Sequence, residues 1–166
     1  MIRDADSMDW EDLVRLNNAE VPHVSRLEVA ELATRWKDAD AIRVWQLEGH
    51  TRAFTVLYGP NSDYPSKNYR WFRSRWTRFY YLDRIVVSPQ FQGRGIGRRM
   101  MEDASELGRG QSLLTCEVNL QPPNPRSMAF HLRLGFRRLG EQWSEQGRKR
   151  VAMLGRDLID RSPGQL

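Results

Sequence analysis

The stretch that decides the fold is residues 85–107, IVVSPQFQGRGIGRRMMEDASEL. It opens with three β-branched apolar residues, and Ser88-Pro89 then signals a turn. Three glycines follow at the alternate positions 93, 95 and 97. Beyond them, apolar residues recur with the period of an amphipathic helix, namely Ile96, Met100, Met101, Ala104 and Leu107. The stretch therefore predicts a strand, a glycine-rich loop and a helix.

A glycine-rich loop at the start of a helix has a chemical use. The first N–H groups of a helix lack partners within the helix and carry partial positive charge. Alternate glycines remove the Cβ atoms that would hold a ligand away from this backbone. Arg94, Arg98 and Arg99 add full positive charges nearby. We therefore predict a site for phosphate oxygens; the alternative is a glycine-rich turn without a ligand.

Two motifs narrow the choice of phosphate ligand. The glycine spacing fits neither the dinucleotide fingerprint nor a Walker A loop. Residues 92–97 match Q-x-x-G-x-G, which resembles the acetyl-CoA pyrophosphate loop of the GNAT superfamily of N-acetyltransferases. Residues 124–136, NPRSMAFHLRLGF, resemble a second motif of that superfamily through Asn124, Ser127, Phe130, Gly135 and Phe136. The resemblance covers about residues 40 to 157.

Length and composition predict one soluble globular domain, residues 1–158, followed by a tail at 159–166. No apolar run is long enough to span a bilayer, and the first residues do not read as a signal peptide. With Cys116 as its single cysteine, the chain is expected to be cytoplasmic. A net charge of +5 suits a phosphate-rich cofactor, so nucleic acid is not needed to explain it.

Periodicity and turn signals predict a mixed sheet flanked by helices, an α/β fold. The expected strands are 2–5, 42–47, 52–58, 78–87, 113–119, 136–143 and 149–158. The expected helices run to about 18 from an N-cap at Ser7, from a Ser25–Glu28 capping box to about 37, and over 96–107 and 127–134. The resemblance implies the GNAT fold, with two central strands splayed to admit the cofactor.

The segment 61–76 is long for a connection, and it mixes aromatic residues with arginines. A long loop in a compact domain is usually functional or disordered, and so many aromatics argue against disorder. We weigh a loop that covers the substrate equally with an aromatic cluster packed over the sheet. Single-stranded nucleic-acid binding is a weaker alternative.

The resemblance implies acetyl-CoA as cosubstrate and no metal. The backbone of Ile85, Val86 and Val87 would pair with the pantetheine arm as an added strand does. The pyrophosphate would lie on Gln92, Gly93, Arg94, Gly95, Ile96, Gly97 and Arg98. Asn124, and less strongly Asn119, would hydrogen-bond the pantetheine side of the cofactor.

Acetyl transfer to an amine needs a group that takes a proton and a group that gives one to the leaving thiolate. Many relatives place a tyrosine after Phe130 as the acid, and here that residue is His131. A protonated His131 could donate to the sulfur as the acid; the alternative is that it hydrogen-bonds the cofactor or a backbone group. Strand alternation puts Asp83 on one face with Ile85 and Val87, so Asp83 is the first candidate base. Glu117 is the second; for either carboxylate, a structural ion pair is the alternative.

The acceptor amine is expected opposite the cofactor, between residues 17–23 and 64–76, as the resemblance implies. Arg70, Arg73 and Arg75 favour a small amino-acid-like amine, because guanidinium groups clamp carboxylates. Three alternatives stay open. They are a protein N-terminus or a lysine as the acceptor, a non-catalytic acyl-CoA sensor in place of an enzyme, and assembly as a homodimer. The candidate acceptor residues are Asn17, Tyr69, Trp71, Phe72 and Tyr81.

Overall fold

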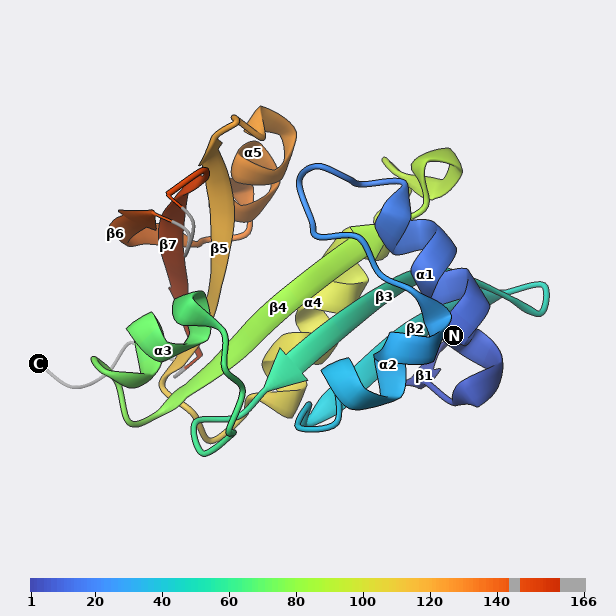
Figure 1. Cartoon of the computed structure of the whole chain (residues 1–166), viewed down its shortest axis with the longest axis horizontal. Helices are drawn as coiled ribbons and strands as arrows, with labels where there is room; N and C mark the ends of the chain where they lie inside the picture. The colour runs from blue at the N-terminus through green and yellow to red at the C-terminus, as the bar shows by residue number, and fades with distance from the viewer. Residues whose placement is uncertain (144–146, 159–166) are drawn as a thin grey trace, which may run out of the picture.

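Seven strands form one mixed sheet in the computed structural model, which describes residues 1–143 and 147–158. The strand order is β1-β2-β3-β4-β5-β7-β6, and every neighbouring pair is antiparallel except β4 and β5 (Figure 1). The strands are β1 (Ile2–Asp4), β2 (Ala41–Leu47), β3 (His50–Tyr58), β4 (Phe79–Val87), β5 (Leu113–Gln121), β6 (Arg137–Trp143) and β7 (Arg150–Asp157).

Helices cover both faces of this sheet, which confirms the predicted α/β architecture. They are α1 (Trp10–Asn18), α2 (Val29–Arg35), α3 (Lys67–Arg73), α4 (Ile96–Leu107) and α5 (Pro125–Arg133), with short 3-10 turns η1 (Ser7–Asp9) and η2 (Pro89–Phe91). Figure 1 shows α1 and α2 in front of β3 and β4, and α4 behind them. The predicted tail, 159–166, and part of the predicted 144–147 turn lie outside the described residues.

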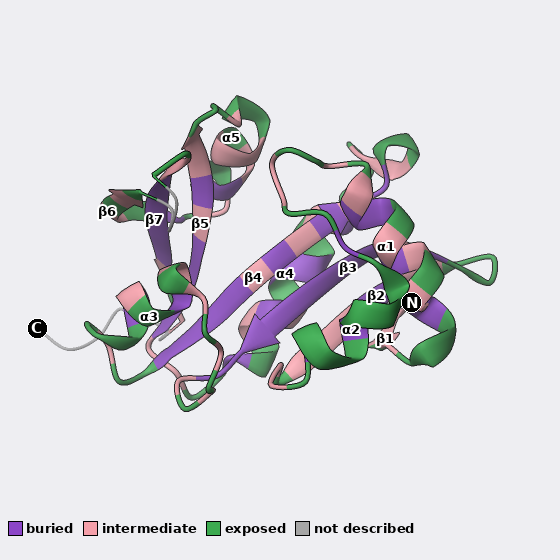
Figure 2. Ribbon diagram, in the orientation of Figure 1, coloured by how far each residue is buried: buried purple, intermediate pink, exposed green. Residues whose placement is uncertain are grey.

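The alternation of side chains along β3 separates two hydrophobic cores. Phe54 and Val56 point to the side of α1 and α2, where they pack with Leu13, Leu16 and Leu32. On the other side, buried residues of α4 pack against the sheet, namely Ile96, Met100, Met101 and Ala104. Each fully buried side chain of Leu or Phe size contributes about 2 kcal/mol through removal of apolar surface from water. Figure 2 shows that β3 and most of β4 are buried as a result.

The parallel strands β4 and β5 stay paired over three positions only. Phe79, Tyr80 and Tyr81 pair with Leu113, Leu114 and Thr115. Beyond them the strands diverge, as Figure 1 shows. The second half of β4 therefore presents one backbone edge that β5 does not pair, and the splay implied by the resemblance is present.

A β-bulge at Asp83 overturns the predicted alternation along β4. Val56 pairs with Arg84 and the next residue, Leu57, pairs with Leu82, so Asp83 is an extra residue without a partner in β3. A bulge inserts one residue into one strand and so shifts the alternation beyond it. Asp83 therefore does not share a face with Ile85, which packs in the core on the α4 side.

Two local predictions in the first helices were also wrong. Asp6, not Ser7, caps the first turn, because its Oδ1 accepts a 2.8 Å hydrogen bond from Met8 N. Helix α2 begins at Val29 and lacks a side-chain cap, so the predicted Ser25–Glu28 capping box does not form. The Ser25 hydroxyl accepts instead from the Arg84 guanidinium at 2.8 Å, a tertiary contact that replaces the local one.

The segment 61–76 is not a continuous loop. It contains helix α3, whose N-cap Ser66 accepts from Tyr69 N at 3.3 Å. Tyr69 and Phe72 are fully buried, and the Tyr64 ring stacks on Tyr58 with centroids 3.9 Å apart. The segment is thus an aromatic cluster packed against the sheet, although three of its residues also reach the cavity described below.

Candidate active site

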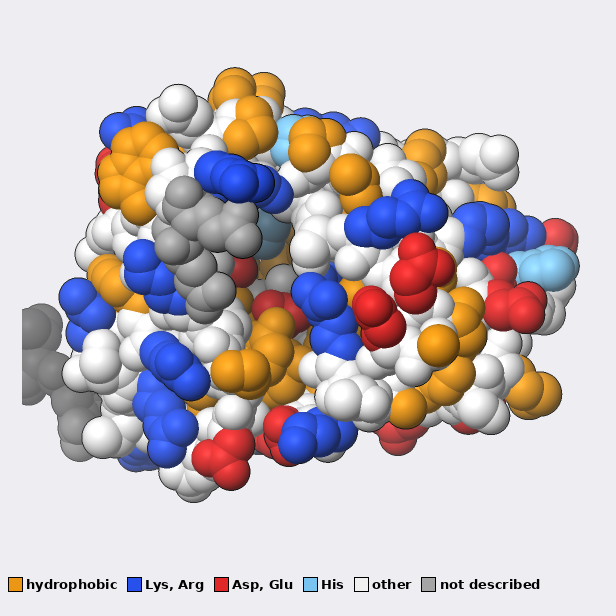
Figure 3. Space-filling model, viewed as in Figure 1, with side chains coloured by type: hydrophobic (Ala, Val, Ile, Leu, Met, Phe, Trp, Pro, Cys, Tyr) orange, Lys and Arg blue, Asp and Glu red, His pale blue; other side chains and the backbone are white. Residues whose placement is uncertain are grey.

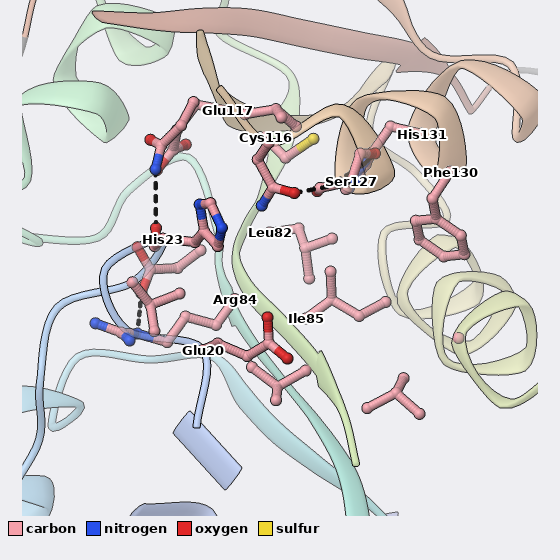
Figure 4. Close-up of a pocket in the computed structure, with 18 of the residues that line it drawn as sticks. Glu20, His23, Leu82, Arg84, Ile85, Cys116, Glu117, Ser127, Phe130 and His131 are labelled. Atoms are coloured by element: carbon pink, nitrogen blue, oxygen red, sulfur yellow. Dashed lines mark hydrogen bonds and ion pairs between the residues drawn. The ribbon is translucent and has the colours of Figure 1, made fainter. Parts of the chain in front are cut away.

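A cavity of about 730 Å³ lies where β4 and β5 diverge. Its walls come from residues 82–87 of β4, 116–119 of β5, the glycine-rich loop, α5 and the connection between α1 and α2. Figure 4 shows Glu20 and His23 on one side and Ser127 and His131 on the other, with β4 between them. The divergence of the two parallel strands thus creates a cavity that a ligand can enter.

The glycine-rich loop has the predicted geometry. Gly93 and Gly95 have φ values of 74° and 79°, a left-handed conformation that favours glycine. Gly95 is the N-cap of α4 and supplies no side-chain cap. In the part of the chain that the structure describes, no carbonyl accepts from the N–H groups of residues 93–98. These N–H groups can therefore receive an anion.

Gly97 serves a different purpose from the other two glycines. A Cβ at this position would lie 3.2 Å from the Phe130 ring and 3.6 Å from Val87 Cγ2. This glycine therefore allows α4, α5 and β4 to approach one another at the cavity. The two sequence motifs, 92–97 and 124–136, meet at this contact.

The two predicted asparagines and Gln92 all have partners. Gln92 Nε2 donates to Val87 O at 3.0 Å, and its Oε1 accepts from Arg126 at 2.6 Å. Asn124 Oδ1 caps α5 by accepting from Ser127 N at 3.2 Å. Asn119 Nδ2 donates to His23 O at 3.1 Å. The amides thus fix the walls of the cavity, which they also line.

These residues fit coenzyme A. The loop offers unpaired N–H groups for two phosphates, and the edge of β4 offers backbone groups for an extended amide-containing arm. Arg98 and Arg126 also line the cavity and add positive charge. Ile85, Val86 and Val87 all lie on its wall, and their pairing with a pantetheine arm stays a prediction.

The two candidate bases converge on one phenol. Tyr81 Oη lies 2.9 and 2.8 Å from the carboxylate oxygens of Glu117 and 3.4 Å from Oδ1 of Asp83. Burial raises the pKa of Glu117, the nearby Asp83 charge adds to the shift, and polar contacts with Tyr81 and Asn68 oppose it, so that the resulting pKa is about 8. Burial also raises the pKa of Asp83, and the charge of Arg84 opposes the shift.

Glu117 differs from Asp83 in its ionic partner. Asp83 Oδ2 lies 3.5 Å from Arg84 Nε, so the ion pair considered as the alternative is present for Asp83. For Glu117, no cation within ion-pair distance occurs among residues 1–143 and 147–158. Of the two carboxyl groups, Glu117 thus has the environment that suits a base working near neutral pH.

Tyr64 and Asn68 reach the site although neither was singled out from the sequence. Tyr64 Oη donates to Asp83 Oδ1 at 3.0 Å. Asn68 lies close enough to Glu117 to lower the pKa of that carboxyl, and its own Oδ1 accepts from Gln142 at 2.7 Å. Both residues lie in the aromatic segment 61–76, so the unusual composition was the available signal.

His131 is buried in the cavity wall at 3% exposure. Its Nδ1 lies 2.8 Å from Ser127 O, and since a carbonyl only accepts, Nδ1 carries the proton. Nε2 has no hydrogen-bond partner among the described residues. Burial lowers the pKa of this imidazole, so near neutral pH it offers an acceptor rather than an acid.

None of the predicted acceptor residues lines the cavity. Asn17 is buried and bonds to Ser25 O and Arg84, while Tyr69 Oη donates to Gly59 O at 2.6 Å. Phe72 is in the core, and the Trp71 ring lies over Gly140. Tyr81 reaches the site only through its hydroxyl. Arg70, Arg73 and Arg75 also lie outside the lining; Arg75 stacks on Trp71 instead.

The connection between α1 and α2 crosses the opening between the two halves of the sheet. Glu20 pairs with Arg126 of α5 at 3.3 Å. Pro22 O accepts from Lys149 at 2.6 Å, and His23 O accepts from Asn119. The buried Arg84 guanidinium anchors the end of this connection, because it donates hydrogen bonds to the carbonyl oxygen and the hydroxyl of Ser25. The connection therefore divides the cofactor side of the cavity from the side that Tyr64 and Asn68 line.

No helix in the described residues has the length and apolarity to cross a membrane. Residues 10–136, more than half of the chain, match the acetyltransferase (GNAT) family. N-alpha-acetyltransferase RimI of Mycobacterium tuberculosis (strain ATCC 25618 / H37Rv) is 33% identical over 61 residues. That match covers 37% of this chain and 37% of the relative, so it spans little more than a third of the relative's length.

Solved structures of similar fold cover the whole domain. The ribosomal-protein-S18-alanine N-acetyltransferase of Escherichia coli is 16% identical, with a TM-score of 0.69 over 100% of this chain and 98% of that one. The structure of yncA from Salmonella typhimurium with its cofactor acetyl-CoA is 16% identical, with a TM-score of 0.68 over 99% and 97%. The splayed sheet, the two motifs and the match over residues 10–136 agree: the chain belongs to the acetyltransferase (GNAT) family of acyltransferases.

Proposed function

We propose that this protein transfers an acetyl group from acetyl-CoA to the α-amino group of a peptide or protein N-terminus. The observation that carries the proposal is the Glu117 carboxyl, which lines the cavity 2.8 Å from Tyr81 Oη and whose burial helps to raise its pKa to about 8. An α-amino group has a pKa of about 7.7 to 8.0. The pKa values of the base and of the acceptor are thus similar, so the transfer of a proton from the ammonium to Glu117 costs little free energy.

The type of acceptor follows from where the arginines lie. A small amino-acid-like amine was expected because Arg70, Arg73 and Arg75 would clamp its carboxylate, but none of them lines the cavity. A peptide N-terminus needs no such clamp. RimI and the E. coli structure, the relatives described above, carry names that specify N-alpha and ribosomal-protein-alanine acetylation, which supports a peptide acceptor.

Acetyl-CoA supplies the activated acetyl group as a thioester when it is bound. Residues 93–98 would hold the pyrophosphate through backbone N–H groups, and the edge of β4 would align the pantetheine arm. Glu117 accepts the proton that the ammonium must lose before the amine becomes a nucleophile. Tyr81 fixes the carboxylate, and the connection between α1 and α2 limits the access of water. The second amine proton leaves with the thiol.

The test is thiol release in the presence of acetyl-CoA, with the product located by mass spectrometry. We expect acetylation of peptides with a free α-amino group and none of the same peptides with a blocked N-terminus and a free lysine. Turnover with small amino acids but not peptides would contradict the peptide acceptor. Tight binding of coenzyme A without turnover of any amine would instead support the non-catalytic sensor.

A further inference from the structure

A second groove, of about 690 Å³, continues from the cavity at its acceptor side. The two spaces share wall residues, among them Arg35, Tyr64, Ser66 and Asn68. Tyr64 also hydrogen-bonds Asp83, and Asn68 lies beside Glu117. An amine at Glu117 therefore has a path along which the rest of its molecule leaves the protein.

The walls of this second space, here called the basic groove, are strongly cationic. Arg35, Lys67 and Arg148 lie on three different segments, and all are exposed. Among the described lining residues, Asp38 is the one carboxylate; the cations are Arg35, Lys37, Lys67, Arg148 and Lys149. On this face, Figure 3 shows Lys and Arg side chains around a hollow within which Asp or Glu side chains are visible.

The sign of charge thus changes along the path. The inner end holds Asp83 and Glu117, which favour a cationic ammonium, and the outer end holds cations, which favour anions. A chain with an ammonium at its tip and carboxylates a few residues later matches both ends. An extended peptide advances about 3.3 Å per residue, so successive residues would lie along the groove.

We propose that the basic groove binds the residues that follow the acceptor's N-terminal residue, and that it selects N-termini in which those residues are Asp or Glu. This inference rests on the proposed function and adds the substrate class. One exposed ion pair changes affinity by only about two- to fivefold. Two or three pairs together give about a tenfold or greater preference, which salt reduces.

The experiment measures kcat/KM for three peptides that differ only at positions two to four, which are all Glu, all Gln or all Lys. At low ionic strength we expect the Glu peptide to exceed the Gln peptide by about tenfold and the Lys peptide by more. In Lys37→Glu combined with Arg148→Glu, the preference for the Glu peptide should be lost or reversed. Arg70→Glu combined with Arg73→Glu is the matched control, because both arginines are exposed, neither lines either space, and the change in net charge is the same.

The outcomes separate the two proposals. Equal kcat/KM for all three peptides would overturn the acidic preference and leave peptide acetylation standing. Loss of the preference in the Arg70→Glu, Arg73→Glu control as well would also overturn it, because net charge alone would then explain the effect. Turnover of small amines only would overturn the proposed function itself. Stronger inhibition by a single-stranded RNA oligonucleotide than by a non-acetylatable Glu peptide would assign the groove to nucleic acid.

Discussion

Tyr81 Oη lies 2.8 Å from Glu117 Oε2 and 3.4 Å from Asp83 Oδ1, so one phenol stands between two buried carboxyl groups. A hydroxyl donates a single proton, so Tyr81 cannot satisfy both carboxylates when both are ionised. Repulsion between like charges at this distance keeps one carboxyl protonated to higher pH. The predictions for Glu117 and Tyr81 follow from this arrangement.

Glu117→Gln should lower kcat/KM by about a hundredfold, since general-base catalysis typically contributes a factor of about 10² or more. In the wild-type enzyme the ionised Glu117 takes its proton from the acceptor ammonium. The variant lacks this base and depends on amine that has already lost its proton in water, so its loss of kcat/KM should shrink as the pH rises above the pKa of the amine. Stopped-time thiol-release assays across this range measure the ratio of the two rates, and a ratio that does not change with pH would rule out Glu117 as the base.

Tyr81→Phe should move the pH–rate midpoint upward by about one unit, because the lost hydrogen bond stabilises the Glu117 carboxylate and lowers its pKa. The rate at the high-pH plateau should change little. Tyr69→Phe is the matched control, since its buried hydroxyl donates to Gly59 O, outside the carboxylate site. Equal shifts of the pH–rate midpoint in both variants would show that the loss of any buried hydroxyl has this effect, and would contradict a direct effect of Tyr81 on Glu117.

The stability of the protein should fall as pH rises from about 4.5 to about 8. The pKa of Glu117 is raised from 4.5 to about 8, so in this window the unfolded chain releases a proton that the folded chain retains. The protonated Glu117 therefore adds its full contribution to the free energy of unfolding below about pH 4.5, the pKa of the carboxyl in the unfolded chain. This contribution disappears as the pH rises to about 8, the pKa of the carboxyl in the folded protein. It is on the order of 4 kcal/mol.

Glu117→Gln provides the control for this pH dependence. The amide cannot ionise, so the urea-unfolding free energy of the variant should decline less over the same window, and the variant should be the more stable protein at the alkaline end. Parallel stability curves for the two proteins would contradict a raised pKa at Glu117.

Gly95→Ala should weaken coenzyme A binding about tenfold or more. Gly95 has a φ of 79°, and its N–H belongs to the loop that would hold the pyrophosphate. Gly49→Ala is the matched control: its φ is 77°, it lies in the β2–β3 turn, and a Cβ at either glycine meets no atom within 4 Å. Both variants should lose about 1 to 2 kcal/mol of stability from the left-handed backbone. Calorimetry with coenzyme A should separate them, and equal affinity would contradict the assigned cradle.

His131 should be neutral, with its proton on Nδ1, throughout the pH range of catalysis. The reason is burial, which lowers the pKa, together with the hydrogen bond that Nδ1 donates to Ser127 O. Nitrogen-15 NMR of the imidazole reports protonation and tautomer directly. An imidazolium signal near neutral pH would restore the acid role suggested by its place in the motif.

Part of the site was predictable because it depends on short sequence spacings. The loop 92–97 and the helix after it form from glycines and apolar periodicity, and the structure shows both. Glu117 and Asp83 were singled out as carboxylates on neighbouring strands, and Tyr81 Oη lies within hydrogen-bonding distance of both. The predicted acceptor residues do not line the cavity. The composition of a segment does not show which of its aromatic or arginine side chains pack into the core and which face a cavity. Tyr69 and Phe72 fill the core, while their neighbour Asn68 reaches Glu117.

The sequence by itself determined the mixed sheet, the glycine-rich loop at 93–98 and the family, because local propensity and motif spacing act within a few residues. Only the tertiary structure decided which groups face the acceptor. The bulge at Asp83 turns one carboxylate away from the Ile85 face, and Tyr81 meets Glu117 from 36 positions away. The basic groove likewise joins α2, α3 and the two residues that precede β7. Such contacts depend on how strands register and diverge, which no local pattern encodes.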